Sequence, residues 1–85
     1  MKLDIYKYDK NIYFIELTEN SICYTDVDFN IAKYLDLSLT DYHQILINNN
    51  AYREIDGDCY FKNIKDTKNA INELEPYIII TTLTK

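Results

Sequence analysis

Along the first 25 residues, apolar runs are separated by short polar stretches, a pattern that is typical of β-strands joined by turns. Aromatic and β-branched residues are frequent in residues 3–8 and 12–18, and the polar residues 9–11 between them predict a hairpin turn. A second polar turn at 18–20 precedes a third short run at 21–25. The pattern therefore predicts a three-stranded antiparallel meander at the start of the chain.

From Val27 onward the apolar residues recur at steps of three and four. Val27, Ile31 and Leu35 fall on one face of a helix, which we expect to be buried. We expect Asp26 or Asp28 to cap this helix, because a carboxylate at the N-cap accepts hydrogen bonds from the N–H groups of the first turn.

A second helix is predicted after a connection of two or three residues. Residues 38–41, Ser-Leu-Thr-Asp, have the form of a capping box. Leu39, Tyr42 and Leu46 share one face, which we expect to turn toward the core. Because the first helix is expected to end near Asp36, the two helices should form a tight corner.

The dipeptide Asp56-Gly57 is the strongest local signal in the sequence. It suits a two-residue type I′ turn, in which both positions need a positive φ. Residues 51–55 and 58–62 on either side are the predicted paired strands.

The end of the chain predicts a helix and then a strand. Asn63 is expected to cap the helix and Pro76 to end it, because proline lacks the N–H donor. Residues 77–83 are apolar on both faces, which predicts a central strand. The order is then βββ-αα-ββ-α-β, so we expect a single α+β domain, residues 1–85, with an antiparallel sheet and a helix-turn-helix-like corner.

The chain is small and acidic, but apolar enough to fold. Its 85 residues carry a net charge of −5, and 47% of them are hydrophobic. Its apolar runs fall far short of the roughly 20 residues of a membrane span, and the first residues lack the apolar core of a signal peptide. We therefore expect a cytoplasmic protein. The abundance of Ile, Asn, Lys and Tyr is typical of an AT-rich genome, which suggests a low-GC bacterium, a phage or another mobile element.

Catalytic and metal-binding motifs do not stand out in the sequence. The only histidine, His43, has neither a Cys-x-x-Cys pair nor a second histidine beside it, so we expect no metal and no cofactor. Cys23 and Cys59 are expected to be reduced thiols. Cys59 shares a strand face with Phe61, which favours an inert buried thiol, and His43 is expected to be partly exposed. We therefore expect that the protein is not an enzyme.

Residues 31–38, Ile-Ala-Lys-Tyr-Leu-Asp-Leu-Ser, have the small alanine and the capping serine of a helix-turn-helix. A hairpin and a helix that starts at Asn63 follow them. Residues 29–74 thus resemble the excisionase-type winged helix-turn-helix proteins. The resemblance implies a helix that reads DNA, a wing and a closing helix.

The sequence departs from that family where DNA would be bound. Asp36 replaces the usual glycine of the turn, and no Lys or Arg occurs between Tyr34 and Tyr52. Because phosphate neutralisation supplies much of the affinity for DNA, we expect no tight binding to duplex DNA.

Acidic residues gather around the predicted corner and hairpin tip. They are carried by the first 60 residues, and with Tyr42 they form a candidate partner-binding set. Its members are Asp26, Asp28, Asp36, Asp41, Tyr42, Glu54, Asp56 and Asp58. Such a set suits a basic partner. Each acidic residue, taken singly, also fits a helix cap or a turn.

The nine tyrosines suggest an interface, because tyrosine gives a large contact area at a low entropy cost. Tyr6, Tyr8, Tyr13 and Tyr24 in the predicted strands suggest a stacking face for single-stranded nucleic acid. The lysines of these strands are balanced by acidic residues, which does not favour that interpretation.

Our first hypothesis is a small non-enzymatic protein-binding module. Its concrete form is a phage or mobile-element inhibitor of a basic, nucleic-acid-handling host protein, of the anti-CRISPR or DNA-mimic type. The alternative is an excisionase-like winged-helix accessory protein that contacts DNA. A second alternative is a homodimer or larger structural assembly paired through edge strands.

Overall fold

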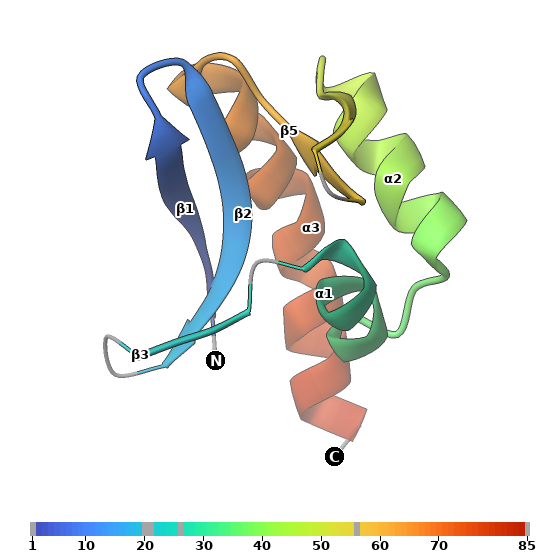
Figure 1. Cartoon of the computed structure of the whole chain (residues 1–85). Helices are drawn as coiled ribbons and strands as arrows, with labels where there is room; N and C mark the ends of the chain where they lie inside the picture. Colours follow the sequence, from blue (N-terminus) through green and yellow to red (C-terminus); the bar gives the residue numbers. More distant parts are fainter. Residues whose placement is uncertain (1, 20–21, 26, 56, 85) are drawn as a thin grey trace.

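The computed structural model in Figure 1 describes residues 2–19, 22–25, 27–55 and 57–84, with side chains except those of 22–25, 54–55 and 79–84. Its fold is α+β, as predicted. Strands β1 (Lys2–Asp9), β2 (Ile12–Glu19) and β3 (Ile22–Thr25) form one antiparallel sheet in the order β1-β2-β3. The predicted N-terminal meander is therefore confirmed.

Strand β2 is the centre of this sheet and is buried on both faces. Ile15 and Leu17 belong to the main core, and Phe14 is buried on the opposite face. Two 2.9 Å backbone hydrogen bonds join Tyr13 to Phe61, just beyond the second sheet. This bridge ties the N-terminal sheet to the hairpin.

Helices α1 (Asp28–Tyr34) and α2 (Leu39–Asn48) form the predicted corner. The Oγ of Ser38 accepts a hydrogen bond from the backbone N–H of Asp41 at 3.0 Å, so the predicted cap is confirmed. Asp36 has a φ of 59°, a left-handed conformation that glycine adopts most easily and aspartate tolerates. The corner therefore needs a glycine-like backbone at the position where the sequence carries Asp36.

The N-terminus of α1 differs from the prediction. Val27 is the N-cap and makes no side-chain capping bond, whereas Asp28 is already the first helical residue. The backbone N–H of Asp28 donates to Oδ1 of Asp58 at 2.8 Å instead. Asp28 therefore does not cap its own helix, and Asp26 lies outside the described residues.

Strands β4 (Tyr52–Ile55) and β5 (Asp58–Tyr60) form the predicted antiparallel hairpin. Gly57 in its turn has a φ of 91°, where a side chain would be strained. Asp56, the other turn residue, lies outside the described residues.

The predicted final strand is wrong: α3 runs without a break over Ile64–Thr84 and contains Pro76. Its N-terminus is capped as predicted, because Oδ1 of Asn63 accepts the N–H of Asp66 at 2.8 Å. Ala70, Ile71 and Leu74 are buried. Tyr77 and Ile78 pack on the same core at the next turn. This apolar stripe continues past the proline, and its burial offsets the roughly 3 kcal/mol that a proline costs inside a helix.

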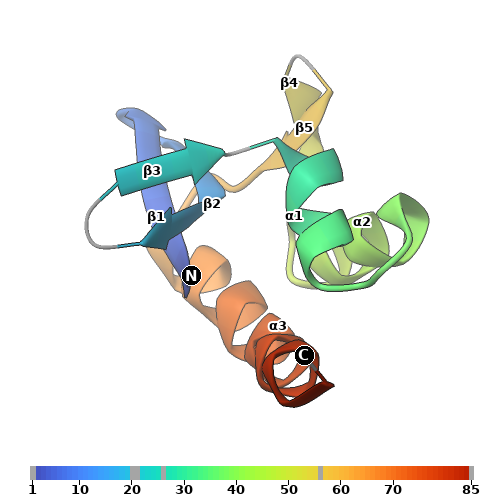
Figure 2. The same ribbon diagram turned by 90° about the horizontal axis from the view of Figure 1, so that it is seen from below.

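One core joins β1, β2, β5 and the three helices. Figure 2 shows α3 nearly end-on, with the N-terminal sheet and the α1–α2 corner lying on different sides of it. Tyr42, Leu46 and Phe61 are fully buried where these parts meet. No helix within the described ranges is both long and apolar enough to cross a membrane.

Candidate functional site

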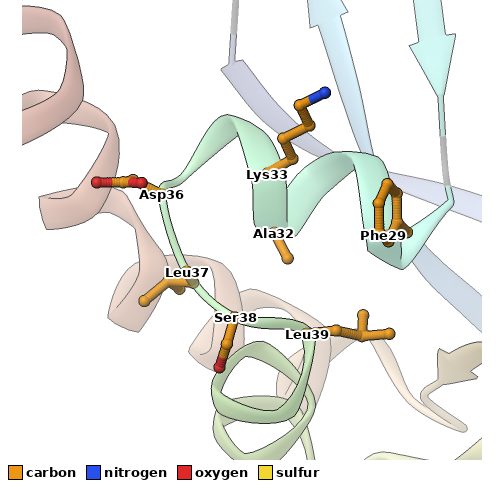
Figure 3. Close-up of a pocket in the computed structure, with 7 residues that line it drawn as sticks. All are labelled: Phe29, Ala32, Lys33, Asp36, Leu37, Ser38 and Leu39. Atoms are coloured by element: carbon orange, nitrogen blue, oxygen red, sulfur yellow. The ribbon is translucent and has the colours of Figure 1, made fainter.

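The outside of the α1–α2 corner holds an open pocket of about 420 Å³. Its lining residues are Phe29, Ala32, Lys33, Asp36, Leu37, Ser38 and Leu39. In Figure 3, Phe29 and Leu39 lie at one end of the pocket, and Asp36 lies at the other. Lys33 points away from it. The pocket thus has an apolar end and, at Asp36, an acidic end whose carboxylate points away from the apolar residues (Figure 3).

Two large apolar side chains of this pocket face solvent. Phe29 is 60% exposed and Leu39 is 39% exposed. Leu39 was predicted to face the core, and this prediction is wrong, because only Tyr42 and Leu46 of that face are buried. Phe29 falls between the buried positions of α1, a helical spacing that could have shown its exposure. Exposed apolar residues next to each other are a feature of binding sites.

The predicted acidic set divides between surface and interior. Asp36 and Asp41 are exposed at the corner, and Asp58 is half-buried in β5. Asp26 and Asp56 lie outside the described residues, as does the side chain of Glu54. Among the described side chains of this set, the exposed carboxylates are therefore those of Asp36 and Asp41.

Asp28 and Tyr42 are not surface residues, which corrects the partner-binding set. Asp28 is 2% exposed and Tyr42 is fully buried. Asp28 lies three, four and seven residues before the buried Ile31, Ala32 and Leu35, so its helical position already turned it inward. Neither side chain can contact a partner directly.

Beneath the corner, the carboxylate of Asp28 joins three elements. Its Oδ2 lies 2.8 Å from Nε2 of His43 on α2 and accepts the backbone N–H of Cys59 on β5, also at 2.8 Å. Burial is the main cause that raises the pKa of Asp28 from its ordinary 3.8 to about 6, and the nearby Asp58 adds to it. The hydrogen bond from Cys59 and the contact with His43 act in the opposite direction.

The ring of Tyr42 lies beside this cluster. Burial raises the pKa of its phenol well above 10, and the charges of Asp28, Cys59 and Asp58 act in the same direction. Its hydroxyl has no hydrogen-bond partner among the described residues. Cys59 is a buried thiol and His43 is partly exposed, as the sequence predicted. The side chain of Cys23 lies outside the described side chains.

A second feature is an aromatic strip, which crosses both sheets and runs through the buried Phe14. Its residues, in spatial order, are Tyr6, Tyr8, Phe14, Tyr60 and Tyr52. Tyr8 is 55% exposed, and Nζ of Lys62 lies 4.4 Å from the centre of the Tyr52 ring. Of the other predicted strand tyrosines, Tyr13 packs on the core and the side chain of Tyr24 is outside the described side chains.

A scan against protein-family models and searches of curated proteins and of solved structures found no match for this chain. Its function is therefore argued from its own residues.

Proposed function

We propose that the protein is a non-enzymatic binding module whose α1–α2 corner docks on a basic protein. The observation that carries this proposal is the exposed pair Phe29 and Leu39 at the apolar end of a pocket whose other end is Asp36. Large exposed apolar side chains beside a charged rim are typical of protein interfaces.

The occupant that fits this pocket is a protein segment with an apolar anchor next to a lysine or arginine. The anchor would fill the space between Phe29 and Leu39, and the cation would face Asp36 at the other end. Lys33, which points away from the pocket, leaves the acidic end available. The net charge of −5 supports the same class of partner, because it attracts basic proteins over a distance.

The concrete form that we propose is an inhibitor of a host nucleic-acid-handling protein, encoded by a phage or another mobile element. Its support is the acidity and the small size of the chain, together with the AT-rich bias of its composition. Proteins that handle nucleic acids carry basic surfaces, and an acidic module competes for them.

An excisionase-like DNA contact is the second candidate. The order of α1, α2, hairpin and α3 supports it, and Arg53 on β4 is exposed where a wing would meet DNA. Against it, the exposed residues of α2 include Asp41 and no lysine or arginine. An anisotropy titration with plain duplex DNA separates the two candidates. Tight binding that weakens steeply with salt would favour the winged-helix function.

The corner is tested by affinity capture from a low-GC bacterial lysate, with nuclease added to one half. We expect the unmodified chain to capture a basic protein even after nuclease treatment. The double variant Phe29→Ala/Leu39→Ala should not capture it. Both side chains are exposed, so the variant should fold.

The aromatic strip supplies the matched control, Tyr8→Ala/Tyr52→Ala, which also removes two exposed apolar side chains. This variant should capture the same protein. If capture instead fails with the strip variant and persists with the corner variant, the corner is not the docking site. The captured protein, once purified, must bind directly with the same dependence on Phe29 and Leu39.

A further inference from the structure

Three side chains that are distant in the sequence meet under the corner. Asp28 on α1, His43 on α2 and Cys59 on β5 each offer one donor atom, and these atoms all lie within 4.8 Å of one another. The set combines an oxygen, a nitrogen and a sulfur. Such a mixed set is the chemistry that zinc accepts in proteins.

The carboxylate of Asp28 is taken out of solvent by the fold, because Asp28 is 2% exposed. Its Oδ2 contacts Nε2 of His43 and the backbone N–H of Cys59, each at 2.8 Å. Among the described side chains, His43 is the one within ion-pair distance of Asp28, and no lysine or arginine lies that close. A buried carboxylate is costly unless it is paired or bound to a metal.

The hydroxyl of Tyr42 is a second, independent sign of a ligand. It is fully buried without a hydrogen-bond partner among the described residues, although buried hydroxyls are nearly always paired. The centre of the Tyr42 ring lies 6.2 Å from that of the His43 ring, which places Tyr42 beside the cluster. A water on a bound ion, or an ion-bound carboxylate, would give this hydroxyl its partner.

We propose that Asp28, His43 and Cys59 form a binding site for a divalent transition-metal ion, with zinc the best match to their donor atoms. Three protein ligands leave a fourth tetrahedral position for water, and Tyr42 lies beside this site as its hydrogen-bond partner. The ion ties α1, α2 and β5 together. This proposal is independent of the docking function.

The donor atoms, which lie within 4.8 Å of one another, must rearrange to bind one ion. The 2.8 Å between Nε2 of His43 and Oδ2 of Asp28 must widen to about 3.3 Å, the separation of two ligand atoms on a tetrahedral zinc ion. The side chain of His43 is 21% exposed, whereas that of Asp28 is 4% exposed. The ion therefore enters past His43, and its binding releases the proton of the Cys59 thiol to solvent.

The test is a titration of the chelator-treated full chain with Co²⁺, which reports its ligands by colour, and then with Zn²⁺ as competitor. We expect one Co²⁺ per chain, an absorption band that requires a metal-bound thiolate, and loss of that band on adding Zn²⁺. Zn²⁺ should also raise the melting temperature, and a chelator should reverse the rise. A chain that gives neither the band nor the melting shift would overturn the proposal without any variant.

Variants then assign the ligands. Cys59→Ser should abolish the thiolate band, whereas Cys23→Ser, the matched control, should keep it. His43→Gln should weaken Zn²⁺ binding by roughly tenfold or more, and Tyr42→Phe, which removes only the unpartnered hydroxyl, should weaken it less. If the band persists in Cys59→Ser and disappears in Cys23→Ser, the metal is bound elsewhere and the proposed site is wrong.

Discussion

Nε2 of His43 lies 2.8 Å from Oδ2 of Asp28, so one polar contact holds α2 against α1 across 15 residues of sequence. The same Oδ2 accepts the backbone N–H of Cys59 on β5. One carboxylate oxygen thus fixes the corner against the hairpin. Its protonation should therefore influence the stability of the whole fold.

We expect Asp28→Asn to stabilise the metal-free protein increasingly as the pH rises. Burial raises the pKa of Asp28 to about 6, so its contribution to stability is complete below its ordinary pKa of 3.8 and is lost as the pH rises through 6. The variant has no such loss. Thermal melts of both proteins, with chelator present, measure this. The melting temperature of the variant minus that of the unmodified protein should increase between about pH 4 and pH 7.

Glu75→Gln, a change at an exposed carboxylate of α3, provides the control and should show a smaller pH-dependent difference. A difference for Asp28→Asn that shrinks as the pH rises would contradict the prediction. It would mean that the contact with His43 outweighs the effect of burial.

The second prediction concerns Phe61, which is fully buried where the two sheets meet. Phe61→Ala should lower the free energy of unfolding by about 3–5 kcal/mol, because it removes a large core side chain and leaves a cavity. Ile47→Ala, at a 43% exposed position of α2, should change it by less than about 1 kcal/mol. Urea unfolding followed by circular dichroism measures both. Similar midpoints for the two variants would show that the sheets do not share a core at Phe61.

The third prediction distinguishes a continuous helix from the strand that the sequence suggested. Pro76→Ala should stabilise the protein by about 1–3 kcal/mol, because alanine restores the N–H donor and removes the ring clash within α3. The helical signal in circular dichroism should grow or stay constant. Glu75→Ala, at the neighbouring exposed position, should have little effect. A loss of stability in Pro76→Ala would indicate that the helix ends at the proline.

Local signals in the sequence predicted most of the fold, because they depend on neighbouring residues. The Ser38 cap and the turn at Gly57 are examples. The helical course of residues 77–84 could not be predicted in this way. A short apolar run suits a buried strand and a buried helix equally, and only its packing in the folded chain decides between them.

The candidate sites depended on contacts between distant residues, which a single sequence does not show. Asp28 and Cys59 are 31 residues apart, and nothing near either of them indicates the other. The polarity of Asp28 suggested a cap or a surface group, although its helical spacing placed it with Ile31 and Leu35 on the buried face. Spacing would have been the better guide here than residue type.

The last prediction concerns Asp36, at the acidic end of the corner pocket, and Asp41, in the first turn of α2. Asp36→Asn/Asp41→Asn should fold normally, because asparagine accepts the left-handed backbone of Asp36 at least as easily as aspartate. The backbone N–H of Asp41, which bonds to Ser38, is unchanged. Any loss of stability should be no more than about 1 kcal/mol, from the weaker interaction with the dipole of α2.

If these two carboxylates attract a basic partner, the double variant should associate several-fold more slowly, and its association rate should depend less on salt. The dissociation rate should change much less, because exposed charges act mainly on the encounter of two proteins. The control is Asp4→Asn/Asp9→Asn on β1, which removes the same charge from exposed positions away from the pocket. Stopped-flow kinetics with the captured partner at two salt concentrations measure both effects. Equal slowing by the two pairs would mean that the partner responds only to net charge, and the corner would then have no special part in steering it.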